Sequence, residues 1–251
     1  MPRQPQDYVG VGLYAPAEAA RYARIAPRKF SRWLYSQKPV FQPQLGKEEG
    51  IVTFMDFAQS LSILDIRLMA GVPLQKIRKA YEFAQKSYDV AYPFGVRHGM
   101  FIFGNLDKPK RCNIGIFLPR PGGSSEDEQK EEFIRRVQLT GRDRGATLIN
   151  VVVQEFSKRI EFNPQTSLAS RYVAHESNGF KIVMDPSIRF GKPFIEGVGY
   201  EAETLAEAAV SEGGIDRAAR LYHVEPDAVR AALDYHRLLN EEPLTPKPAA
   251  A

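Results

Sequence analysis

The sequence has a single cysteine, Cys112, among 251 residues. One thiol excludes an internal disulfide and fits a protein of a reducing compartment. Long apolar runs are also missing, since no stretch approaches the roughly 18 apolar residues of a membrane-spanning helix. Residues 1–7 contain no apolar segment of the kind that a signal peptide needs. We therefore expect a cytoplasmic protein that does not enter a membrane.

Recognisable catalytic patterns are equally scarce. The histidines, His98, His175, His223 and His236, stand at no metal-ligand spacing to one another or to Cys112. The sequence also lacks the Gly-x4-Gly-Lys-Ser/Thr pattern of a phosphate-binding loop. We predict a protein that is not an enzyme and needs no metal or cofactor. A hydrolase in the middle region is kept as an alternative, which no residue spacing supports.

Charge is distributed unevenly along a composition that is otherwise ordinary for a soluble protein, with 43% apolar and 25% charged residues. Residues 1–111 contain 17 Lys and Arg against 9 Asp and Glu, whereas residues 171–251 contain 9 against 13. A basic front suits phosphate contacts, and an acidic rear suits a basic partner. The alternative is that the uneven charge distribution arose by chance and only keeps the surface solvated.

Two short helical patterns, residues 14–23 and 26–34, each have a proline near their start and are separated by a tight break. This arrangement is typical of a helix-turn-helix, whose second helix enters the DNA major groove. The early residues of that second helix are Arg28, Lys29 and Arg32, which we expect to face outward. A structural hairpin with a solvated basic face would show the same pattern.

A small β-wing is expected in the polar loop after these helices. The loop, residues 36–50, is flanked by the β-prone pairs 40–41 and 51–52. Lys38 and Lys47 would then lie along the DNA backbone. A plain surface loop is the alternative.

The remaining patterns predict an α+β protein that is mainly helical. Thr53 and Asp56 stand at capping-box spacing ahead of an amphipathic helix that Gly71 ends, and Pro73 begins the next helix. Further expected elements are strands within 92–118, a helix over 148–162, strands at 171–174 and 180–184, and helices at 201–211, 215–222 and 225–239. The predicted domains are 8–90, a middle region 91–180 with a flexible linker at 121–132, a three-helix unit at 181–240, and a disordered tail at 241–251.

The front of the chain resembles MerR-type regulators. The resemblance is carried by Thr53-Phe54-Met55-Asp56-Phe57 and Gly71-Val72-Pro73-Leu74-Gln75-Lys76-Ile77-Arg78, and it spans about residues 12–85. It implies a winged helix-turn-helix that binds DNA. The loop of residues 36–50 departs from a standard wing. No effector-binding cysteine set follows, so the resemblance does not extend to metal sensing.

A second resemblance lies near the C-terminus. The pattern Asp185-Pro186-x-Ile188-x-x-Gly191-Lys192-Pro193-x-Ile195-x-Gly197 resembles the signature of domain-of-unknown-function family 433. With the MerR-like front, the whole chain looks like a large VapB-type antitoxin, which implies a PIN-like ribonuclease toxin as partner. Gly197-Val198-Gly199 stands where this family often has Gly-Thr-Arg, so no role is carried over for that arginine.

These resemblances imply an antitoxin that neutralises a ribonuclease and represses its own operator, acting as a homodimer. Four glutamates of the acidic rear are our candidates for the toxin or dimer contact: Glu201, Glu203, Glu207 and Glu212. The alternative is a MerR-like regulator with an effector-binding rear domain and no toxin partner.

Overall fold

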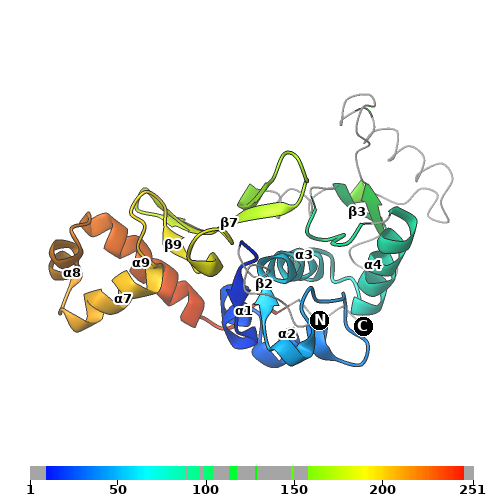
Figure 1. Ribbon diagram of the computed structural model, residues 1–251, viewed down its shortest axis with the longest axis horizontal. Coiled ribbons are helices and arrows are strands. Elements are labelled where there is room, and N and C mark those ends of the chain that lie inside the picture. Colours follow the sequence, from blue (N-terminus) through cyan, green and yellow to red (C-terminus); the bar gives the residue numbers. More distant parts are fainter. Residues whose placement is uncertain are drawn as a thin grey trace.

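The computed structural model of the protein describes residues 10–88, 90–96, 99–103, 113–117, 128, 148–149 and 158–245. Figure 1 shows an elongated molecule, with the N-terminal helices and the C-terminal helices on opposite sides of a small sheet. The expected α+β class is confirmed. His98, Cys112 and all of the expected linker 121–132 except Glu128 lie outside the described residues. Within the described part, no helix is both long and apolar enough to cross a bilayer.

The expected pair of N-terminal helices is present as α1 (Pro16–Tyr22) and α2 (Pro27–Tyr35). Each helix begins at a proline, whose fixed φ suits the first helical position. Between them Arg24 adopts a left-handed φ of 54°, which reverses the chain within a few residues. The positions of the two helices and of the turn between them therefore follow from local sequence signals.

The expected β-wing is not formed, which corrects the interpretation of the loop. Residues 40–41 are not a strand, and β2 (Val52–Thr53) pairs instead with β1 (Leu13–Tyr14), which lies ahead of α1. Val40, Phe41 and Leu45 are buried in the core. Because burying these apolar side chains holds the loop against the body, it folds as irregular chain with one 3-10 turn, η2 (Lys47–Glu49).

The two helices that follow are α3 (Phe54–Ala70) and α4 (Leu74–Tyr88). The capping box is confirmed: Asp56 N donates to Thr53 Oγ1, and Thr53 N donates to Asp56 Oδ2, each at 3.2 Å. Gly71 ends α3 with a left-handed φ of 59°. The buried face of α3, which includes Phe57, Leu61 and Leu64, forms the centre of the front core.

The expected helix over residues 148–162 is wrong at both of its ends. Its first two residues are β5 (Leu148–Ile149), which pairs with β3 (Gly99–Phe103), and its last three are β6 (Ile160–Phe162). The expected strands in 92–118 are confirmed, since β3 pairs antiparallel with β4 (Asn113–Phe117). The apolar residues at helical spacing predicted a helix here. Both ends are strands instead, because each pairs through its backbone with another strand, β5 with β3 and β6 with β7 (Ala169–Ser177).

A four-stranded antiparallel sheet joins the front of the molecule to the rear. Its order is β6, β7 (Ala169–Ser177), β8 (Phe180–Met184) and β9 (Phe194–Ile195). The boundary predicted at residue 181 falls inside this sheet, because β7 pairs with β8. Tyr172 of β7 packs on Phe57 of α3 at a ring-centroid distance of 5.5 Å, while Ile182 of β8 belongs to the rear core.

The rear core lies under three helices close to their expected positions: α7 (Ala202–Ser211), α8 (Ile215–Tyr222) and α9 (Pro226–Asn240). Small alanines let α7 and α9 approach closely. The expected disorder of residues 241–251 is corrected for residues 241–245. Leu244 N donates to Arg24 O at 2.8 Å, and Glu241 pairs with Arg24 at 2.6 Å. Residues 246–251 lie outside the described part.

Candidate nucleic-acid interface and the junction behind it

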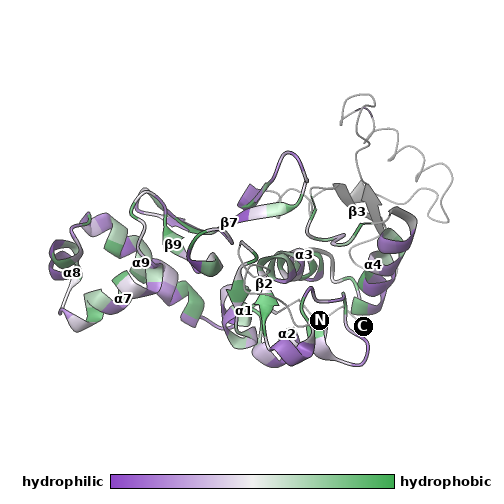
Figure 2. Ribbon diagram, viewed as in Figure 1, coloured by the Kyte–Doolittle hydropathy of each residue, from purple (hydrophilic) through white to green (hydrophobic). Residues whose placement is uncertain are grey.

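The exposed face of α2 carries two of the predicted DNA-binding cations. Arg28 and Arg32 are exposed, whereas Phe30 and Leu34 of the same helix are buried in the front core. Residues four apart lie on one helix face, so the two guanidinium groups can act on the same stretch of duplex. Figure 2 shows hydrophilic residues on the outer side of α2. The helix is thus amphipathic in the way that a recognition helix requires.

Lys29 departs from the expectation that it faces outward. Its ammonium group lies 5.6 Å from the centroid of the Trp33 ring, and the side chain is half-buried. Partial burial lowers the pKa of Lys29, and the positive charge of Arg67 lowers it further. Trp33 itself is a core residue. Lys29 is therefore oriented by a cation–π contact on the flank of α2 and is a poorer candidate than its two neighbours.

The structure places the two loop lysines differently. Lys38 is exposed just after α2, and its backbone is held because Arg78 of α4 donates to the carbonyl oxygens of Lys38 and Pro39, each at 2.7 Å. Lys47 is exposed at the start of η2. Arg78 was not singled out in the sequence, although its place in the MerR-like pattern is a signal for a structural role.

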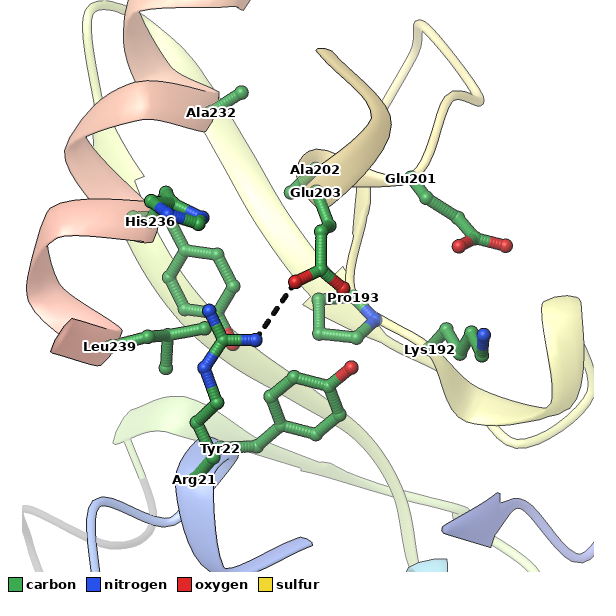
Figure 3. A pocket seen from close by; sticks show the side chains of 11 residues that line it. Arg21, Tyr22, Lys192, Pro193, Glu201, Ala202, Glu203, Ala232, His236 and Leu239 are labelled. Carbon is green, nitrogen blue, oxygen red and sulfur yellow. Dashed lines mark hydrogen bonds and ion pairs between the residues drawn. The ribbon is translucent and has the colours of Figure 1, made fainter. Parts of the chain in front are cut away.

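Two elements near α2, the helix α1 and the strand β1, contact the rear of the molecule, and we call this contact region the junction. Arg21 Nη1 lies 2.9 Å from Glu203 Oε1 of α7, as Figure 3 shows. The Tyr14 hydroxyl, buried in the front core, donates to Gly191 O at 2.9 Å. A Cβ atom on Gly191 would lie 2.1 Å from that hydroxyl oxygen, so only glycine fits here. The family-433-like segment therefore packs directly on the strand that precedes α1.

A narrow hollow lies at this junction, between α1, α7 and α9. Figure 3 shows Arg21, Tyr22, Lys192, Glu203 and His236 around it. Its open space accommodates about one water molecule. Within the described residues, no group of three or more histidines, cysteines or acidic residues is arranged to hold a metal ion.

The four candidate glutamates differ in whether they have an ion-pair partner in the same chain. Glu203 pairs with Arg21, and Glu201 lies 3.7 Å from Arg189. Glu207 and Glu212 are exposed at α7 and its C-cap. The sequence offered no signal for these pairings, because the partners are up to 182 residues apart.

Comparison with known proteins identifies relatives of this arrangement. Residues 182–236 match the model of a family described as "Protein of unknown function (DUF433)". The chain is 24% identical over 244 residues to a Mycobacterium tuberculosis protein provisionally named antitoxin VapB45, and the match covers 89% of this chain and 93% of that protein. The similarity to that protein thus extends over almost the full length of both chains.

The fold is also seen in a solved structure. The X-ray crystal structure of Rv2018 from Mycobacterium tuberculosis matches with a TM-score of 0.59 at 21% sequence identity. The match covers 90% of this chain and 99% of that one. The front helices, the joining sheet and the rear helices therefore form an arrangement shared between the two proteins.

Proposed function

We propose that the protein is the antitoxin of a type II toxin-antitoxin system, which neutralises a PIN-like ribonuclease and represses its own operator. The similarity to the protein provisionally named antitoxin VapB45, which runs along 89% of the chain, carries most of this proposal. The exposed Arg28 and Arg32 of α2 support the operator-binding part. The proposed partners are operator DNA, the toxin and a second copy of the chain.

In the proposed operator complex, the α2 face lies in the major groove. Arginine can bind guanine O6 and N7 with two hydrogen bonds, and either arginine can also contact a phosphate. Lys38, whose backbone Arg78 holds in place, would contact the adjacent DNA backbone, and Lys47 would do so from η2. A homodimer would place two such helices on a two-fold operator.

In the proposed toxin complex, the rear unit, which contains helices α7 to α9, contacts the nuclease. Glu207 and Glu212 are exposed, and they suit a basic RNA-binding surface on the nuclease. Glu201 and Glu203 already pair with arginines of the same chain, so we assign them to the junction.

Co-expression with the product of the neighbouring ribonuclease gene tests the antitoxin assignment. With an affinity tag on the nuclease, this chain should co-purify and should suppress RNA cleavage. A nuclease that is recovered alone, at full activity, rules the assignment out.

A mobility shift with the protein's own promoter tests the recognition helix. Arg28→Ala combined with Arg32→Ala should weaken binding and reduce the slope of log affinity against log salt by about 1 for each phosphate that is no longer neutralised. Because both side chains are exposed, the unfolding midpoint should stay within experimental error of the wild type. Unchanged promoter affinity would reject the assignment of α2.

The alternative function is a MerR-like regulator that has no toxin partner. The observation that favours it is the direct contact of α1 with the rear unit, through which an effector could act on α2. This alternative predicts promoter binding without any co-purifying nuclease.

A further inference from the structure

The turn between α1 and α2 is contacted by a segment from near the other end of the chain. After α9 ends at Asn240, residues 241–245 return to the front core (Figure 1), and we call this segment the strap. Glu241 Oε2 lies 2.6 Å from Arg24 Nη2, and Leu244 N donates to Arg24 O at 2.8 Å. Both contacts thus reach Arg24, the left-handed residue that reverses the chain between the two helices.

The strap also makes an apolar contact. The half-buried Leu244 side chain packs on the front core, to which Phe30 of α2 belongs. Pro243, just before it, has a fixed φ and restricts Glu242 to extended backbone. Because the proline removes conformational freedom from the free segment, less entropy is lost when the strap lies against the turn. The strap is therefore suited to a lasting intramolecular contact.

The helix pair depends on contacts from outside itself. The helices α1 and α2 have seven and nine residues, which is too short for either to be stable in isolation. The φ of 54° at Arg24 is unfavourable for a residue with a Cβ atom. Core side chains such as Phe30 decide which face of α2 is buried. The strap holds the turn from which α2 starts.

The position of this turn matters for the proposed DNA contact. The helix α2 begins at Pro27, and Arg28 lies in its first turn, four residues after Arg24. In a helix-turn-helix, the N-terminal residues of the second helix contact the base edges. Hydrogen bonds weaken steeply when their angle departs from linearity, so a loosened turn would weaken the contacts of Arg28. The strap's own charged groups, Glu241 and Glu242, would repel phosphates and are unsuited to bind DNA directly.

We propose that the strap is a positioning element for operator binding, because Glu241 and Leu244 hold the turn at Arg24. With the turn held, Arg28 enters the major groove in a fixed orientation. This inference rests on the proposed operator binding and adds to it residues that change DNA affinity without touching DNA.

Promoter mobility shifts with Glu241→Ala and Glu242→Ala form a matched pair. Both residues are exposed, and each variant removes one negative charge, but within the described residues only Glu241 pairs with a cation. Loss of a negative charge by itself favours DNA binding, so Glu242→Ala should bind as tightly as the wild type or slightly more tightly. Glu241→Ala should bind about threefold or more weakly. Its slope of log affinity against log salt should stay unchanged, because no phosphate contact is lost.

A charge swap tests whether Arg24 acts through the strap or binds DNA itself. Arg24→Glu alone should weaken promoter binding. Arg24→Glu combined with Glu241→Arg should recover most of the loss, because the swap restores an ion pair of reversed polarity. A swapped protein that binds as weakly as Arg24→Glu would mean that Arg24 contacts DNA directly, which overturns the positioning role.

Hydrogen exchange without DNA distinguishes a loosened turn from general destabilisation. In Glu241→Ala combined with Leu244→Ala, the amides of residues 24–30 should exchange faster, whereas those of α3 should keep their protection. Unchanged exchange at the turn, or an equal increase in α3, contradicts the proposal. If the wild type binds the promoter and Glu241→Ala binds as tightly as Glu242→Ala, the strap assignment is wrong and operator binding stands. If the wild type does not bind the promoter, both proposals fail.

Discussion

At the scale of single residues, Gly191 is the position where the family-433-like segment depends most on its amino acid. It combines a φ of 85° with the close approach of the Tyr14 hydroxyl. We expect Gly191→Ala to lower the free energy of unfolding by about 3 kcal/mol, because backbone strain and steric overlap add. Urea denaturation followed by circular dichroism measures this change.

Gly197→Ala separates the two causes. Gly197 has a φ of 77°, but a Cβ atom there would meet no other atom within 4 Å. Its substitution should cost only the backbone strain, about 1 kcal/mol. Equal losses for the two variants would show that contact with Tyr14 is unimportant.

The carboxyl group of Asp56, which forms the capping box at the start of α3, should make the stability of the protein depend on pH. Burial raises the pKa of its carboxyl to about 6, although hydrogen bonds from Gln44 and Thr53 favour the charged form. Between about pH 4 and pH 6 the folded state therefore retains a proton that the unfolded state releases. The contribution of Asp56 to stability should fall as the pH rises through this window and stay constant above it.

Asp56→Asn removes this titration, so comparison with the wild type isolates it. The wild type's stability advantage over the variant should shrink by about 1–3 kcal/mol between pH 4 and pH 7. Urea denaturation of both proteins at several pH values gives this difference. A difference that stays constant or grows with pH would contradict the raised pKa.

At the scale of elements, the chain contains two pairs of consecutive helices, α1–α2 and α8–α9, which differ in the charge that they expose. The α1–α2 pair exposes Arg28 and Arg32. On α9, Arg230 pairs with Asp227 and Arg237 pairs with Asp234. Because each of these α9 cations has an acidic neighbour on its own helix, the rear pair presents little net positive charge to DNA.

Arg230→Ala combined with Arg237→Ala should therefore leave promoter affinity and its salt dependence unchanged. The same number of cations is removed as in the Arg28 and Arg32 double variant, which makes the two a matched pair for mobility shifts. A comparable loss of affinity in both would place DNA on the rear unit as well.

At the scale of the whole molecule, the sheet from β6 to β9 makes the front and rear cores interdependent. Tyr172 and Met184 contribute to the front core, and Ile182 and Ile195 contribute to the rear core. Strands that serve two cores transmit the loss of one to the other. We therefore expect the described parts to unfold in one cooperative transition.

The only tryptophan of the sequence, Trp33, is buried in the front core and reports on that part alone. Its fluorescence and the far-ultraviolet circular dichroism should give the same urea midpoint. Ile182→Ala, which removes about 2–5 kcal/mol from the rear core, should shift both midpoints together. Separate midpoints would show that front and rear unfold independently.

The sequence by itself determined the features that act over a few residues. Prolines at helix starts, the Thr53–Asp56 capping box and the glycine after α3 predicted the front helices, and turn residues similarly delimited α7 to α9. Hydrogen bonds and steric limits between near neighbours produce these features, so they can be read directly from the chain.

Only the tertiary structure decided which distant residues meet. It turned the expected wing into a loop anchored by its buried apolar residues, and it placed Lys29 against Trp33. It also assigned Glu203 to an ion pair with Arg21 and left Phe190 exposed on a strained turn. These outcomes depend on burial and on contacts between residues far apart in the sequence. A local sequence pattern cannot predict them, because the free energy of such a contact depends on the tertiary structure around it.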